Sequence, residues 1–88
     1  MSVTFSATPN PNAGKFTIGR PVGAGKASRS FHNAQQAADD DVARELFQLD
    51  GVASVFMVSD FLTVTKREEA SWSDLIPLVT STLERHYS

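Results

Sequence analysis

Residues 52–66 read VASVFMVSDFLTVTK, and this stretch decides the fold of the chain. Residues 52–58 are rich in Val and predict a strand with apolar side chains on both faces. Ser59-Asp60 is a turn pair, and residues 61–66 return as a second strand. Because so short a connection joins only antiparallel strands, the stretch predicts a β-hairpin.

The segment before this hairpin, residues 33–49, predicts a helix in two pieces. Its apolar residues recur at the spacing of one helix face: Val42, Leu46 and Leu49. The acidic run Asp39-Asp40-Asp41 predicts a short helical turn over 34–38 and then a main helix capped near Asp39 or Asp40, since carboxylates accept hydrogen bonds from free N–H groups. Asp50-Gly51 then ends the helix.

The segment after the hairpin predicts a final helix that starts at Ser71, with Asp74 completing a capping box. Pro77 removes one hydrogen bond within this helix and is expected to bend it. One apolar stripe runs along the helix and predicts its buried face, with the single tryptophan as a core anchor: Trp72, Leu75, Ile76, Val79 and Leu83.

The N-terminal third predicts a second hairpin and a weak third strand. Residues 2–8 alternate, with Val3, Phe5 and Ala7 on one face, and a strand over 15–20 places Phe16 and Ile18 inward. The loop between them is PNPNAG, residues 9–14. The polar segment 26–31 is expected at a sheet edge.

The element order is therefore β-β-(β)-α-β-β-α. Because hairpins require antiparallel pairing, we expect an α+β fold of two layers, with one mainly antiparallel sheet and both helices on one face. A length of 88 residues predicts a single domain over residues 1–88.

Composition excludes several classes of protein. The sequence contains no cysteine, which excludes disulfide scaffolds, thiolate zinc sites and cysteine-ligated iron–sulfur clusters within it. No apolar run reaches membrane-spanning length and no secretory signal is visible, so we expect no membrane association and a cytoplasmic location. The net charge of −2 and the lack of aromatic residues among the basic ones disfavour nucleic acid.

Charge is unevenly distributed along the chain. Residues 1–38 carry four basic and no acidic side chains, whereas residues 39–88 carry ten acidic and four basic ones. Either the two halves attract each other weakly, or a basic edge docks an acidic partner.

No pattern indicates catalysis or a resident cofactor. His32 and His86 lie 54 residues apart without a ligand motif, and the glycines match no phosphate-binding loop. The acidic run lacks the spacing of a calcium loop. We therefore expect neither an enzyme nor a cofactor-binding or metal-binding protein.

Two features suggest a surface for a protein partner. The central hairpin has apolar side chains on both of its faces. Phe61, next to the turn residue Asp60, is therefore expected to be exposed on the face away from the helices, unless loops or residues 21–31 cover that face. The first loop is stiffened by two prolines and offers Asn10 and Asn12 as hydrogen-bonding groups, or it is simply a well-formed connection. Two basic residues adjoin that loop and its strand: Lys15 and Arg20.

The motif TPNPNA at residues 8–13, followed by Lys15-Phe16, resembles the opening of the N-terminal domain of Nfu/NifU-type iron–sulfur scaffold proteins. The hairpin pattern GV-x-SVF…DF-x-TVTK resembles the same family. Further matching positions extend over most of the chain, from about residue 3 to 86: Gly19-Arg20-Pro21-Val22, Ser30-Phe31, Ala43-Arg44-Glu45-Leu46-Phe47, Trp72, Leu75 and Pro77.

The resemblance implies a two-layer α/β domain that contacts protein partners of iron–sulfur cluster assembly. In that family a second domain with a CxxC pair holds the cluster, and this sequence contains no cysteine, so the cluster-binding activity is not carried over. We expect a stand-alone interaction module. The alternatives are a protein that binds iron or another metal through oxygen and histidine ligands, and a module recruited to an unrelated process. Iron binding is associated with the family, but no residue pattern here supports it.

Overall fold

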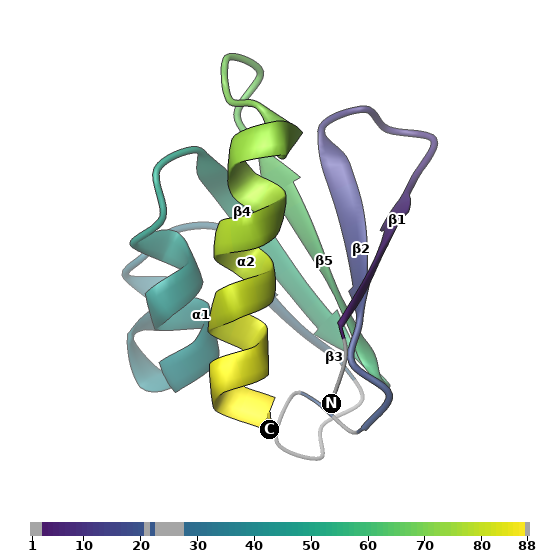
Figure 1. The fold of residues 1–88 in the computed structure, drawn as a ribbon. Coiled ribbons are helices and arrows are strands. Elements are labelled where there is room, and N and C mark those ends of the chain that lie inside the picture. Colours follow the sequence, from purple (N-terminus) through teal and green to yellow (C-terminus); the bar gives the residue numbers. More distant parts are fainter. Residues whose placement is uncertain (1–2, 21, 23–27, 88) are drawn as a thin grey trace.

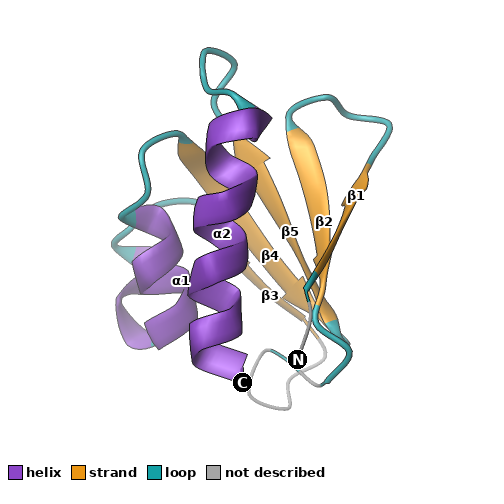
Figure 2. Ribbon diagram, viewed as in Figure 1, coloured by secondary structure: helices purple, strands orange, loops and turns teal. Residues whose placement is uncertain are grey.

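The computed structural model describes residues 3–20, 22 and 28–87, and this part of the chain forms a sheet of five strands with helices on one face (Figure 1, Figure 2). The strands are antiparallel and lie in the order β1-β2-β5-β4-β3. The predicted α+β class with two layers is confirmed. The elements in chain order are β1 (Thr4–Ala7), β2 (Ala13–Thr17), β3 (Ser28–Phe31), the 3-10 helix η2 (Gln36–Asp39), α1 (Asp41–Phe47), β4 (Val52–Val58), β5 (Phe61–Lys66) and α2 (Trp72–Tyr87).

The central hairpin has the predicted bounds. β4 and β5 pair up to Val58 opposite Phe61, so Ser59 and Asp60 alone make the turn. Ser59 adopts a positive φ of 56°, as two-residue turns that follow the sheet's twist require. This hairpin forms the middle of the sheet, because β2 pairs with β5 on one side and β3 pairs with β4 on the other.

The first hairpin differs from the prediction in the start of its second strand. β2 begins at Ala13 rather than Lys15, because the Ala13 N–H donates to the Asn10 carbonyl at 3.0 Å and closes the turn early. Gly14 is therefore a strand residue rather than a loop residue. A Cβ there would lie 2.5 Å from Phe5 Cε1 and 3.0 Å from Trp72 Cη2, so the packing of the two rings requires glycine.

The other ends of the N-terminal strands also shift. β2 ends at Thr17 rather than Arg20, because the N–H groups of Ile18 and Gly19 donate to the Asp60 carbonyl, at 2.8 and 3.4 Å. β3 lies at the sheet edge, as predicted, and the first two residues of its expected range, 26 and 27, lie outside the described residues.

The helical segment does divide at the acidic run. Asp40 caps α1, and its carboxylate accepts from the Ala43 N–H at 2.9 Å. α1 ends at Phe47, earlier than the predicted Leu49, because the N–H groups of Gln48 and Leu49 donate to carbonyls three residues back, which is 3-10 rather than α-helical geometry. Gly51, with a φ of +100°, then turns the chain into β4.

The core lies between the helices and the inward sheet face. In α2, the predicted stripe supplies Leu75, Val79 and Leu83, which are fully buried. Trp72 is only partly buried and closes the edge of the core rather than sitting within it. Ser71 caps α2 as expected, but its Oγ accepts from the Ser73 N–H at 3.2 Å rather than from Asp74. The largest fully buried side chains of the sheet and α1 are Phe16, Leu46, Val55, Met57, Leu62 and Val64.

Candidate partner-binding surfaces

The six residues predicted to bind a partner do not form one cluster in the structure. Asn10 and Asn12 occupy the loop at one end of β2, whereas Asp60 and Arg20 lie near its other end, where Thr17 pairs with Phe61. Phe61 also lies at this second end, directly after Asp60, and its ring contacts Lys15, two residues before Thr17 in β2. The structure therefore forms one compact site from only two of the six.

The loop over residues 8–12 is held together by its own polar groups. Asn10 Oδ1 accepts from the Asn12 N–H at 2.9 Å, and Asn12 Oδ1 accepts from Lys66 Nζ at 3.0 Å. The Pro11 carbonyl accepts from Trp72 Nε1 at 3.0 Å. Both asparagines thus shape the loop, and the side-chain groups left for a partner are their amide N–H donors. A docking role for this loop stays a prediction.

The second pair of predicted residues also makes contacts within the chain. Arg20 donates to the Tyr87 carbonyl at 2.6 Å, which places a cation at the C-terminal end of α2, where it opposes the negative end of the helix dipole. The backbone carbonyl of Asp60 accepts hydrogen bonds from the N–H groups of Ile18 and Gly19. These contacts give both positions a structural role.

The sheet face away from the helices is the clearest candidate for a contact surface, and we call it the open face (Figure 1). Lys15 Nζ lies 4.5 Å from the centroid of the Phe61 ring, a cation–π contact. Phe56 is 38% exposed, one of two large hydrophobic side chains with high exposure among the described residues. Strand alternation places thirteen residues on the open face, and Lys15 is the charged one among them: Thr4, Ser6, Ala13, Lys15, Thr17, Ser28, Ser30, Ser54, Phe56, Val58, Phe61, Thr63 and Thr65.

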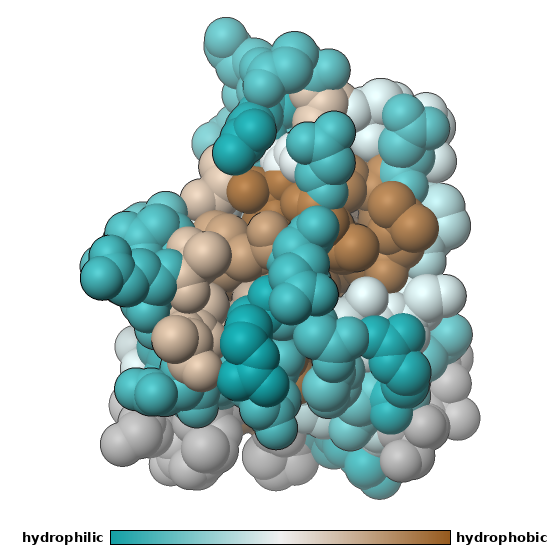
Figure 3. All heavy atoms as spheres, turned by 90° about the vertical axis from the view of Figure 1, so that its left-hand side faces the viewer, coloured by the Kyte–Doolittle hydropathy of each residue, from teal (hydrophilic) through white to brown (hydrophobic). Residues whose placement is uncertain are grey.

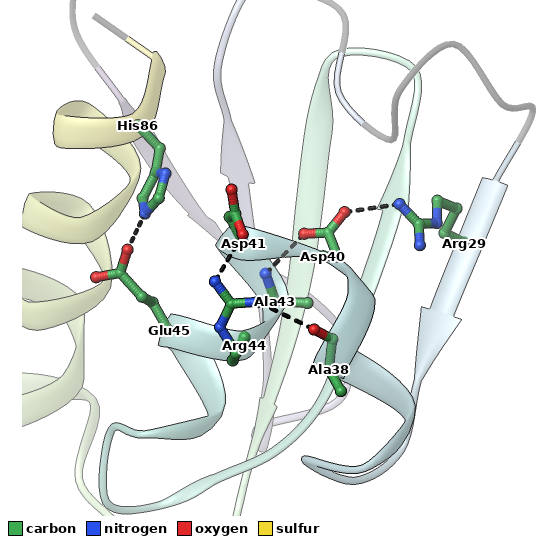
Figure 4. A network of polar contacts seen from close by, with 8 residues as sticks. All are labelled: Arg29, Ala38, Asp40, Asp41, Ala43, Arg44, Glu45 and His86. Atoms are coloured by element: carbon green, nitrogen blue, oxygen red, sulfur yellow. Dashed lines mark hydrogen bonds and ion pairs between the residues drawn. The ribbon is translucent and has the colours of Figure 1, made fainter.

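A polar network on the helical side connects elements far apart in the sequence (Figure 4). Glu45 of α1 bridges Arg85 and His86 of α2, and the hydrogen bond to His86, aided by Arg85, lowers the pKa of Glu45 against the opposing effect of burial. Arg29 of β3 donates to Asp40 at 2.6 Å. The network ties α1 to α2 and to the sheet edge. Sequence reasoning missed it, because no local pattern links residues about 40 positions apart.

The described residues contain neither a metal-binding cluster nor a membrane-spanning helix. No group of three or more histidine, aspartate or glutamate side chains there could hold a metal ion. None of the helices in residues 3–20, 22 and 28–87 has both the length and the apolar character needed to cross a membrane.

A family model described as "Scaffold protein Nfu/NifU N terminal" matches residues 3–88. The chain belongs to the Nfu/NifU N-terminal domain family. The resemblance carried by the TPNPNA motif and the central hairpin is thereby confirmed.

Curated relatives of this Nfu N-terminal domain are considerably longer than it is. The chain is 40% identical over 84 residues to the "NFU1 iron-sulfur cluster scaffold homolog, mitochondrial" of Homo sapiens, covering 94% of this chain and 33% of that protein. It is 36% identical over 88 residues to "NifU-like protein 5, mitochondrial" of Arabidopsis thaliana, covering 100% of this chain and 32% of that protein. The chain thus spans about a third of the length of these relatives.

Solved structures share the fold. The solution structure of a NifU-like protein from Saccharomyces cerevisiae superposes with a TM-score of 0.83 at 26% identity, covering 94% of this chain and 75% of that one. The crystal structure of protein SAV1430 from Staphylococcus aureus gives a TM-score of 0.80 at 28% identity, covering 93% and 98%.

Proposed function

We propose that this domain is a protein–protein interaction module of iron–sulfur cluster assembly and that a partner docks on its open face. Membership of the Nfu/NifU N-terminal family supports a role in iron–sulfur cluster assembly. The 88 residues contain no cysteine, the residue whose thiolate normally ligates such clusters. The contribution we propose for this domain is therefore contact with a partner rather than ligation of the cluster.

The observation that carries the proposal is the pair of aromatic side chains, Phe56 and Phe61, on a face that the helices leave uncovered. Buried aromatic residues surrounded by near-neutral polar contacts dominate the energetics of many protein interfaces. Serine and threonine side chains surround the pair here, so docking desolvates few charges. Lys15 beside Phe61 adds a cation that a carboxylate of the partner can pair with.

The experiment is capture of partners by the tagged protein from iron-limited cells, with the recovered proteins identified by mass spectrometry. We expect proteins that build or receive iron–sulfur clusters, and we expect the double variant Phe56→Ser/Phe61→Ser to lose them. The matched control is Val42→Ser, which removes a half-buried hydrophobic side chain on α1, on the helical side of the sheet, instead. Thermal melting checks that each variant is folded.

Three outcomes contradict the proposal. These are capture of the same proteins per folded molecule by the double variant, loss of these proteins by the control as well, and a captured set in which no protein belongs to cluster assembly.

The double variant Asn10→Ala/Asn12→Ala separately tests the predicted role of the first loop. A lower melting temperature with unchanged capture per folded molecule would make these asparagines purely structural.

A further inference from the structure

A pocket of about 270 Å³ lies on the opposite side of the sheet from the open face, between the connection that follows α1 and the first turns of α2. Its apolar lining comes from Ala70, Leu75 and Leu78. Leu78 is 48% exposed, the larger exposure of the two prominent surface hydrophobics in the described chain. Hydrophobic side chains also gather on the side of the molecule where α1 lies in Figure 1, bordered by hydrophilic ones (Figure 3).

The polar lining of this pocket is acidic. It includes the carboxylates of Asp50, Glu69 and Asp74 and no basic side chain. All three residues are exposed, and none forms an ion pair with another described residue, unlike Asp40, Asp41 and Glu45. The positive end of the α2 dipole is close by, but it amounts to only about half a charge and is outweighed by three carboxylates. The lining of the pocket therefore carries net negative charge beside an apolar surface.

The size and chemistry of the pocket indicate its occupant. Small-molecule sites usually measure roughly 300–1,000 Å³, so this smaller pocket suits a single side chain. Lysine and arginine combine an apolar stem with a cationic end, and they bury the stem along apolar surface while the charge stays at the rim. We propose that this pocket receives a lysine or arginine side chain from a basic, amphipathic segment of a partner protein, with Leu78 contacting the apolar face of that segment.

The inference is independent of the proposed function, because it concerns a different face and a different contact chemistry. It is tested with a defined probe: a helix-forming peptide that carries leucine and arginine on one face. The peptide is titrated into the isotope-labelled protein and followed by NMR. We expect shifts at the backbone amides of residue 50, residues 69–76 and residue 78, and an affinity that falls as salt screens the charges.

Variants separate the acidic pocket from general acidity. The triple variant Asp50→Asn/Glu69→Gln/Asp74→Asn should bind the peptide about tenfold more weakly, whereas Glu68→Gln, an exposed acid outside the lining, should bind it unchanged. A peptide with citrulline in place of arginine keeps the shape, loses the charge and should also bind about tenfold more weakly. Leu78→Ala tests the apolar contact at an exposed position, where the substitution leaves the core intact.

The proposal is overturned if the triple variant binds as tightly as the natural sequence, if Glu68→Gln weakens binding equally, if the citrulline peptide binds equally well, or if the shifts fall on other residues. It is also overturned if the arginine peptide causes no shift at millimolar concentration. Phe56→Ser/Phe61→Ser should bind this peptide normally, so failure of one proposed surface leaves the other testable.

Discussion

Replacing Trp72 by alanine tests how the sheet edge, the first loop and α2 hold together. The indole ring packs on Phe5 and Phe16, with ring centroids 5.4 and 6.2 Å away, and its Nε1 donates to the Pro11 carbonyl. Removing about 100–150 Å² of buried aromatic surface, at about 25 cal/mol per Å², costs about 2.5–4 kcal/mol. The lost hydrogen bond adds about 0.5–1.5 kcal/mol.

We therefore expect Trp72→Ala to lower the free energy of unfolding by about 3–5 kcal/mol, a large share of the roughly 5–15 kcal/mol of a typical domain. The assay is urea unfolding followed by circular dichroism, since the variant lacks the only tryptophan. Trp72→Phe keeps a ring but not the N–H donor, so its loss should be about 1–2 kcal/mol. A loss below about 0.5 kcal/mol for the alanine variant, the range of ordinary surface substitutions, refutes this reasoning.

Four further expectations follow from the packing and the polar contacts. Gly14→Ala should cost about 1–3 kcal/mol in urea unfolding, because the new methyl group meets two rings; an unchanged midpoint contradicts this. Asp40→Ala should cost about 1–2 kcal/mol, since it removes the cap of α1 and the partner of Arg29; an unchanged midpoint would show that neither contact stabilises the fold. The pKa of Glu45 is lowered in the folded protein, so the stabilising effect of its carboxylate is present above the unfolded pKa and is lost as the pH falls through the folded pKa. In unfolding measured from pH 6 to 3, Glu45→Gln should therefore lose less stability than the natural sequence; equal losses for the two proteins contradict this. Reconstitution with iron and sulfide should leave no visible absorption on the desalted protein, and a stoichiometric band that survives desalting would contradict this.

Local signals were sufficient for much of the fold. The Val-rich run over residues 52–58, the turn pair after it and the returning run over residues 61–66 predicted both strands of the central hairpin with their observed bounds. The division of the helical segment at Asp40 was also predictable, because the capping preference of aspartate acts over only a few residues. Short-range periodicity and capping are the properties that a single sequence records directly.

The errors arose where distant contacts override local preference. Gly14 suggests a turn by its residue type, but it is a strand residue whose missing side chain makes room for Phe5 and Trp72. The contact between Lys15 and Phe61 was not predicted, because it follows from the strand register, which pairs Lys15 with Thr63 and Thr17 with Phe61.

The same limitation applies to the polar groups. Asn10 and Asn12 were predicted as hydrogen-bonding groups for a partner, and in the structure their side-chain oxygens accept hydrogen bonds within the chain. The acidic pocket combines three segments from 50 to 78, so no single motif could have indicated it.

We propose that a protein of cluster assembly docks on the open face. The most direct test is an NMR titration of the isotope-labelled protein with the partner recovered by capture, purified and added in known amounts. If the partner docks on the open face, the largest amide shifts fall on the outward-facing residues of β2, β4 and β5, around Lys15, Phe56 and Phe61. Shifts confined to the helices or to the loop over residues 8–12, with the open face unchanged, would contradict it.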